Sequence, residues 1–143
     1  MFNSSKIRNP SCISDASFDS INHKSKHAGH IAWLDKSNER KEKEICFEED
    51  NSLDSNEAEI KAILISVKAI VKNYKFSKLF ILTDSMNAAN LINKRSKSRK
   101  YVSLIKSITK IVNDLKQKKV FVEITWKSRN HELIKKLHER VSK

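Results

Sequence analysis

The sequence predicts an α/β domain built on one five-stranded mixed sheet, an antiparallel meander followed by parallel strands, with helices packed on it. Two observations predict this class. Before residue 50, short strand-like segments are joined by polar turns, as in an antiparallel meander. From residue 57 onward, segments with helical apolar spacing alternate with strand-like segments, which is typical of strands connected by crossover helices.

The five strands are predicted from short β-prone segments. Polar turns at residues 21–27 and 35–43 separate the first three. The last segment, "VFVEITW", is rich in the β-branched and aromatic residues that favour strands. Trp33 and Trp126 are expected to pack on the sheet rather than to stack on a ligand. The predicted strands are residues 11–18, 28–34, 44–49, 77–83 and 120–126.

Apolar residues at helical spacing predict the helices. In the first one, residues 57–73, the apolar stripe runs from Ile60 to Val71, and Asp54 or Ser55 is the expected N-cap. Further helices are expected at residues 85–93, from about 102 to 115, and from about 130 onward.

Length and composition indicate a single globular domain at residues 11–143, after a short flexible lead-in at residues 1–10. Hydrophobic residues make up 38% and charged residues 32%, which fits a globular chain better than a disordered one. The net charge of +12 favours a polyanionic partner, nucleic acid first and an anionic membrane second. The alternative is that part of the charge reflects only a compositional bias, since lysine, isoleucine, serine and asparagine are all abundant.

Cellular context follows from what the sequence lacks. Cys12 and Cys46 are too few for a disulfide framework and show no metal-ligand spacing. The start has no apolar core of a signal peptide, and lysines interrupt every apolar run before it reaches membrane-spanning length. We therefore expect a cytoplasmic, reduced protein.

Three acids occupy comparable places in the predicted fold: Asp15 in the first strand, Glu59 in the first turn of the first helix, and Asp84 at the end of the fourth strand. The two strands are expected to lie side by side, with the helix starting near the same edge. Converging carboxylates repel, and a divalent cation is the usual remedy. Each acid also has a structural explanation: an exposed strand residue, a helix-dipole partner and an N-cap, respectively.

The segments around these acids resemble the ribonuclease H family. The resemblance implies a ribonuclease H-like fold and catalytic, metal-binding roles for Asp15, Glu59 and Asp84. It also implies two Mg²⁺ ions, with Mn²⁺ as an alternative, and Asp15 as their bridging ligand. The matching segments, in the family's order, are "SDAS" (14–17), "NEAEIKAIL" (56–64) and "ILTDS" (81–85).

The family's fourth acid is expected at Glu132. If Leu137 matches the family's final-helix leucine, Lys135 stands where the acid belongs; a shorter loop places Glu132 there instead. Glu132 is the acid nearest the helix start and is the predicted fourth catalytic ligand, with an ordinary helix-dipole acid as the alternative. His131 is expected either to assist turnover or to be a solvent-exposed residue.

The basic connector "KRSKSRK" (94–100) is expected to neutralise backbone phosphates, with a solvated loop as the alternative. Polar residues near the acids are expected to contact a nucleic-acid strand, as the resemblance implies. The predicted nucleic-acid-binding residues are Asn56, Asn87, Lys97, Arg99 and Lys100.

The function expected from these features is a metal-dependent endonuclease that hydrolyses the RNA strand of RNA–DNA hybrids by a two-metal-ion mechanism. The hybrid preference comes from the resemblance, whereas composition indicates only a polyanionic partner. The alternative is a catalytically weak or inactive ribonuclease H-like module that binds nucleic acid. The chain is expected to act as a monomer on a hybrid or another nucleic acid, without membrane association.

Overall fold

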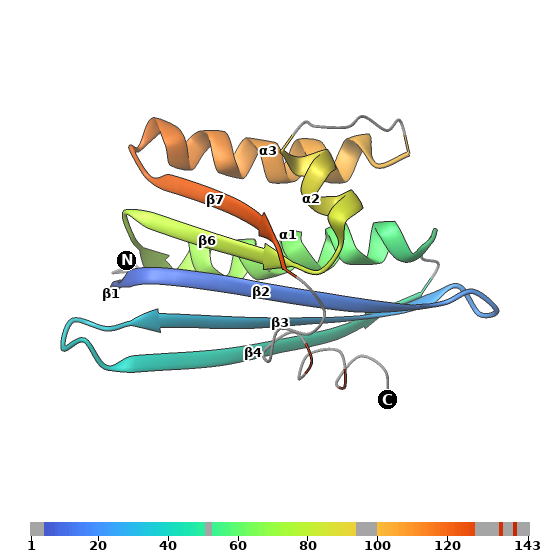
Figure 1. Ribbon diagram of the computed structural model, residues 1–143, viewed down its shortest axis with the longest axis horizontal. Helices are drawn as coiled ribbons and strands as arrows, with labels where there is room; N and C mark the ends of the chain where they lie inside the picture. The colour runs from blue at the N-terminus through green and yellow to red at the C-terminus, as the bar shows by residue number, and fades with distance from the viewer. Residues whose placement is uncertain (1–4, 51–52, 94–99, 128–134, 136–138, 140–143) are drawn as a thin grey trace.

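The computed structural model describes residues 5–50, 53–93, 100–127, 135 and 139. The described segments form the predicted mixed α/β fold (Figure 1), with a five-stranded sheet in the order β4-β3-β2-β6-β7 and a two-stranded pair, β1-β5. The elements are β1 (Ser5–Lys6), β2 (Arg8–Asp19), β3 (Lys24–Leu34), β4 (Arg40–Glu49), α1 (Ser55–Asn73), β5 (Tyr74–Lys75), β6 (Lys78–Thr83), α2 (Met86–Ile92), α3 (Val102–Gln117) and β7 (Phe121–Trp126).

Strand pairing confirms the predicted topology. β2, β3 and β4 form an antiparallel meander, whereas β6 pairs in parallel with both β2 and β7. β2 therefore lies in the middle of the sheet, between the meander and the parallel strands. This order places the end of β6 beside β2, as expected for converging acids.

Two predicted turns are too long. β3 starts at Lys24 and β4 at Arg40, so residues 24–27 and 40–43 belong to strands rather than turns. The physical reason is clearest in β4, an edge strand whose charged side chains are mostly exposed and do not need an apolar partner. Cross-strand ion pairs such as Lys26–Glu48 (3.9 Å) also let charged residues sit on the ladder.

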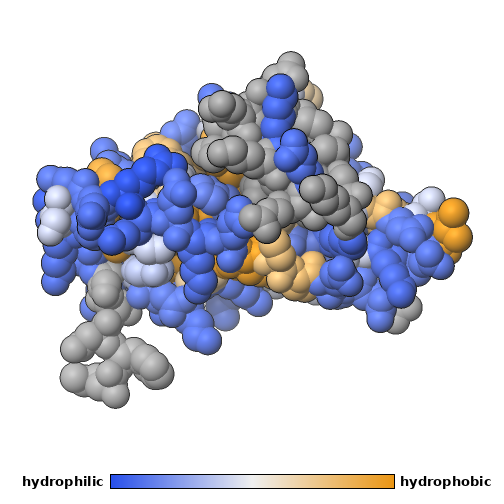
Figure 2. Space-filling model, turned by 90° about the horizontal axis from the view of Figure 1, so that it is seen from below, coloured by the Kyte–Doolittle hydropathy of each residue, from blue (hydrophilic) through white to orange (hydrophobic). Residues whose placement is uncertain are grey.

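The outer surface near this edge is mainly hydrophilic, as Figure 2 shows. Such charge on an edge strand disfavours pairing with another chain. No helix among the described segments is both long and apolar enough to cross a membrane. The last predicted helix lies outside the described residues, apart from Lys135 and Glu139, which are helical and exposed.

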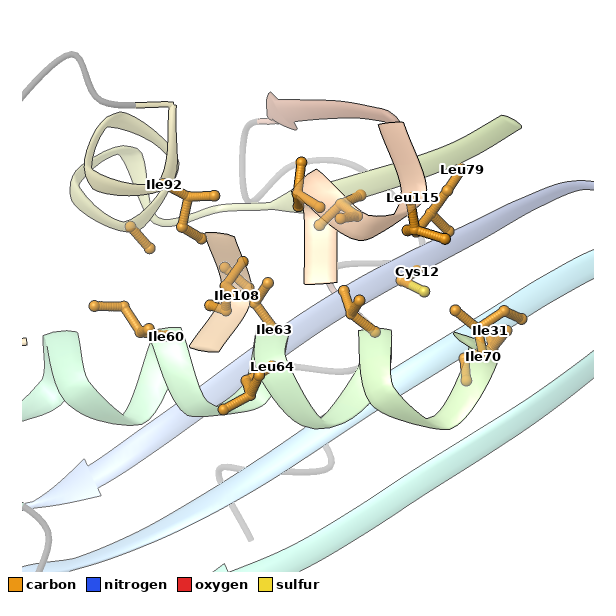
Figure 3. Close-up of a cluster of buried hydrophobic side chains, with 14 of the residues drawn as sticks. Cys12, Ile31, Ile60, Ile63, Leu64, Ile70, Leu79, Ile92, Ile108 and Leu115 are labelled. Atoms are coloured by element: carbon orange, nitrogen blue, oxygen red, sulfur yellow. The ribbon is translucent and has the colours of Figure 1, made fainter. Parts of the chain in front are cut away.

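α1 covers β2 and β3 and supplies one wall of the apolar core. Figure 3 shows Ile60, Ile63 and Ile70 of this helix among core side chains that include Ile108 and Leu115 of α3. Ile60, Ile63 and Ile70 are fully buried, and burying one such side chain contributes about 1.5–3 kcal/mol. This packing fixes the path of α1 across the sheet.

Small residues let α1 approach the sheet closely. Ala16 of β2 packs against Ala58 and Ala62 of α1 in a separate buried cluster. On the next strand, a Cβ atom added at Gly29 would collide with the Ser66 hydroxyl. Gly29 is therefore favoured for space, because the Ser66 hydroxyl of α1 occupies the position that a methyl group would need.

Gly29→Ala should lower the free energy of unfolding by about 1–3 kcal/mol, because the methyl group overpacks the contact with Ser66. Urea unfolding of the variant measures this loss. Adding Ser66→Ala removes the colliding hydroxyl, so the double variant should be more stable than the sum of the two single effects predicts. Additive effects, or a Gly29→Ala variant as stable as the parent, would contradict this account of the helix–sheet contact.

Candidate metal centre

The structure brings Asp15, Glu59 and Asp84 together. One carboxylate oxygen from each lies within 4.8 Å of the others. Within the described residues, these three acids form the one group of His, Cys, Asp or Glu side chains that could hold a metal ion. Asp15 comes from β2, Glu59 from α1, and Asp84 from the residue directly after β6. The convergence of the three acids expected from the strand order is therefore present in the fold.

Asp15 occupies the point where two neighbouring strands separate. The parallel pairing of β2 with β6 ends at the Ser14–Thr83 pair, while β2 continues to Asp19. From Asp15 onward, the edge of β2 that faced β6 is open to groups from other elements. Asp15 itself has no exposed surface, which excludes the alternative of an exposed strand residue.

Glu59 reaches this open edge from α1. It lies in the second helical turn, not the first as predicted, because α1 starts at Ser55 and its first-turn acid is Glu57. Burial raises the pKa of Glu59 strongly, and the charges of Asp15 and Asp84 raise it further. A hydrogen bond from the Ala16 backbone amide opposes this shift only in part. Without a cation, Glu59 therefore keeps its proton at neutral pH.

The third acid, Asp84, lies in a short link between β6 and α2 whose other polar groups have structural roles. Ser85, not Asp84, is the N-cap of α2, and its hydroxyl accepts a hydrogen bond from the Ala88 backbone amide (3.1 Å). Thr83 Oγ1 accepts from the Ser85 amide (3.1 Å), and the Trp126 indole donates to the Asp84 carbonyl (3.0 Å). The capping explanation for Asp84 is therefore wrong, and its carboxylate is directed to the acidic cluster.

The donor set fits a hard divalent cation. All three side chains offer carboxylate oxygens, the ligands that Mg²⁺ and Mn²⁺ prefer. In addition, Glu59 Oε2 is buried and accepts no hydrogen bond from the described residues. A buried carboxylate oxygen without a donor is costly, and a cation would satisfy it.

Of the other predicted site residues, three are described. Asn56 is half-buried in the first turn of α1, three positions before Glu59. Asn87 is exposed in the first turn of α2, three positions after Asp84. The ammonium group of Lys100 lies 3.7 Å from Asp54 Oδ2, on a side chain that is 66% exposed. The roles of these three residues in binding nucleic acid stay predictions.

The remaining predicted residues lie outside the described part of the chain. These are Lys97 and Arg99 of the basic connector, and Glu132 and His131 of the final segment. Lys135 is described and exposed. The fourth ligand therefore stays a prediction at Glu132.

Two aromatic residues near the site were not predicted to support it. Trp126 was expected to pack on the sheet, yet it is 43% exposed and holds the Asp84 carbonyl. Tyr101 directs its hydroxyl to Asp54, the N-cap of α1, at 2.7 Å. The available signal for Trp126 was its place at the end of a predicted strand, because the neighbouring predicted strand ends at the candidate acid Asp84. Nothing in the sequence pattern links Tyr101 to Asp54, because 47 positions separate them.

Fold and acidic cluster together define a ribonuclease H-like protein. The sequence model of a family described as "Reverse transcriptase-like" matches residues 14–138. The chain therefore belongs to this family, and the predicted resemblance to ribonuclease H is confirmed. A search of curated proteins found no significant match.

Solved structures of ribonucleases H share the fold at low sequence identity. LC9-RNase H1, described as a type 1 RNase H with the type 2 active-site motif, has a TM-score of 0.73 at 11% identity, with 98% of this chain and 72% of that chain covered. RNase H1 from Halobacterium salinarum has a TM-score of 0.62 at 14% identity, with 94% and 92% covered. The N-terminal RNase H domain of a Mycobacterium tuberculosis protein, solved as a fusion with maltose binding protein, has a TM-score of 0.72 at 10% identity, with 94% and 96% covered.

Glu59→Gln should stabilise the cation-free protein at pH 7 by up to about 3 kcal/mol. The folded protein keeps a proton on Glu59 that the unfolded chain loses above pH ~4.3, so the parent loses stability as the pH rises toward the folded pKa. Glutamine removes this dependence. The measurement is thermal unfolding in a chelator between pH 7 and 9, where His27 stays neutral because burial lowers its pKa to about 4.

Glu123→Gln is the matched control, since Glu123 is exposed on β7. It should leave the pH dependence of the parent unchanged. A Glu59→Gln variant that is no more stable than the parent at pH 7 would show that burial and the neighbouring acids do not raise the pKa of Glu59 in the folded protein.

Proposed function

We propose that this protein is a metal-dependent endonuclease that hydrolyses the RNA strand of RNA–DNA hybrids. The observation that carries the proposal is the group of three carboxylates within 4.8 Å, positioned by β2, α1 and the end of β6 in a ribonuclease H-like fold. The solved neighbours are named ribonucleases H, which supports the choice of a hybrid as the substrate.

Asp15, Glu59 and Asp84 would hold Mg²⁺ or Mn²⁺, and the resemblance to ribonuclease H makes Asp15 the proposed shared ligand. When bound, the cations supply an activated water and stabilise charge on the phosphate and the leaving oxygen. The protein's own contribution is to hold the three carboxylates in place. Glu59 would release its proton on binding a cation, and the Trp126 indole holds the link that carries Asp84.

A polyanionic substrate agrees with the charge of the chain. The net charge of +12 favours binding of the phosphate backbone and makes that binding dependent on salt. Asn56 and Asn87, each in the first turn of a helix beside the acids, are the proposed contacts to the nucleic-acid strands. Lys97, Arg99 and Lys100 are the proposed phosphate contacts.

A second candidate function is a nucleic-acid-binding module with little or no turnover. The feature that favours it is the sequence of the final segment, where Lys135 stands in place of the family's fourth acid if Leu137 matches the family's leucine. Glu132 is the proposed fourth ligand. If Glu132 does not act as a ligand, the same fold and charge would still bind nucleic acid.

The parent protein should cleave the labelled RNA strand of a hybrid in the presence of Mg²⁺, and cleave duplex DNA and duplex RNA much more slowly. Asp15→Asn, Glu59→Gln and Asp84→Asn should each reduce the cleavage rate at least about 100-fold, because each removes an anionic cation ligand. Gel-resolved cleavage under single-turnover conditions measures the rates, and circular dichroism shows that the variants remain folded.

Asp114→Asn serves as the matched control, because Asp114 is exposed on α3. Its cleavage rate should equal that of the parent. Hybrid binding without cleavage at any Mg²⁺ or Mn²⁺ concentration would favour the binding module. Near-normal cleavage by Asp84→Asn would refute the assignment of the metal centre.

A further inference from the structure

Tyr101 connects two helices that are distant in sequence. It precedes α3 and occupies its N-cap position, but its side chain makes no capping hydrogen bond to α3. The ring belongs to the apolar core, and the residue is only 6% exposed. Its hydroxyl instead donates to Asp54 Oδ2 at 2.7 Å, at the start of α1. The Tyr101 side chain therefore links the start of α3 to the start of α1.

Asp54 uses its two oxygens for two separate tasks. Oδ1 accepts a hydrogen bond from the Glu57 backbone amide (2.9 Å) and so caps α1. Oδ2 accepts from Tyr101 and lies 3.7 Å from the Lys100 ammonium group. Burial and the nearby Asp54 carboxylate raise the pKa of Tyr101, so its hydroxyl keeps the proton that it donates. The helix cap is thus itself anchored.

This anchor lies close to the acidic cluster along α1. Glu59 follows Asp54 by five positions, a rise of about 7.5 Å along one rigid helix. A second contact holds the same part of α1 on its other flank, where Lys61 pairs with Glu49 of β4 (2.7 Å) and with Glu57 (3.3 Å). The first two turns of α1 are therefore fixed to α3 on one side and to the sheet edge on the other.

A fixed helix start matters because the acids repel one another. Asp15 is held by the sheet and Asp84 by the link to α2, whereas Glu59 is carried by α1, so the position of its carboxylate depends on the start of that helix. A shift of the α1 start would move the Glu59 carboxylate away from the other two. The contacts at Asp54 and Lys61 oppose that shift.

We propose that Tyr101 is a positioning residue for the metal centre: through its hydrogen bond to Asp54 it holds the start of α1 so that Glu59 stays within reach of a cation shared with Asp15 and Asp84. This inference rests on the proposed cation site. Tyr101 does not touch the cation in this arrangement. Its effect is therefore expected on cation affinity, which is measured without nucleic acid.

The test compares Tyr101→Phe with Tyr74→Phe in the full-length chain. Both substitutions remove one hydroxyl, but Tyr74 lies at the opposite end of α1, with its ring against Trp33 (centroids 4.8 Å apart). Isothermal titration with Mn²⁺, without substrate, gives the affinity. Tyr101→Phe should weaken Mn²⁺ binding about three- to tenfold, less than the loss of a group bonded directly to a metal ligand. Tyr74→Phe should leave it unchanged.

A second comparison shows whether Tyr101 acts through Asp54. Asp54→Ser keeps a good N-cap but removes the second carboxylate oxygen. In that background, Tyr101→Phe should have a clearly smaller effect on Mn²⁺ affinity than it has in the parent. In cleavage assays, Tyr101→Phe should lower kcat at subsaturating Mg²⁺, and saturating Mg²⁺ should restore part of the loss.

The possible outcomes separate this inference from the proposed function. If the parent binds no Mn²⁺ in this titration, the proposed cation site fails and the inference fails with it. If the parent binds Mn²⁺ and Tyr101→Phe binds it equally well, the positioning role is refuted while the cation site stands. Equal losses in Tyr101→Phe and Tyr74→Phe would also refute it, because they would show a general effect on α1.

Discussion

The repulsion among Asp15, Glu59 and Asp84 is the constraint on which the rest of the structure depends. Oxygens from the three side chains lie within 4.8 Å of one another. Two full charges at such a distance repel by roughly 3 kcal/mol at an effective dielectric constant of 20. A domain of this kind is stable by only about 5–15 kcal/mol in total. The fold must therefore leave a proton on the cluster or supply it with a cation.

The scaffold meets this constraint by placing the acids on β2, on α1 and directly after β6, elements that pair with or pack against one another. β2 lies in the middle of the sheet, and its pairing with β6 ends just before Asp15. Gly29, Ala16 and Ala58 allow α1 to lie close to the strands, which brings Glu59 to the open edge of β2. A helix held by apolar contacts along its length cannot move one residue away without disturbing the core. The same packing that stabilises the fold thus holds the acids together.

Much of this arrangement was predictable from the sequence, because it follows from local patterns and chain order. The alternation of strand-like and helical segments defines the sheet order, and that order places the end of β6 beside β2. The apolar stripe of α1 and its cap at Asp54 were equally visible. By contrast, the start of β4 was predicted as a turn, because an exposed edge strand carries the same charged residues as a loop.

The contacts that hold the site in place were harder to predict because they join residues far apart in the chain. Tyr101 follows a run of basic residues and looks like the end of a solvated connector, yet its hydroxyl reaches Asp54. Trp126 looks like a strand residue, yet its indole holds the carbonyl of a candidate ligand. Sequence spacing identifies residues that share an element. It does not identify a side chain whose partner is set by the packing of two elements.

Anomalous X-ray diffraction from crystals grown or soaked with Mn²⁺ tests the central claim most directly. The claim is that the buried carboxylates form a cation site rather than a structural cluster kept neutral by protons. The expected result is an anomalous peak coordinated by oxygens of Asp15, Glu59 and Asp84, and no such peak in the same position in Asp84→Asn crystals. Anomalous density that is absent from this cluster at millimolar Mn²⁺, or that lies only at other sites, would contradict the claim.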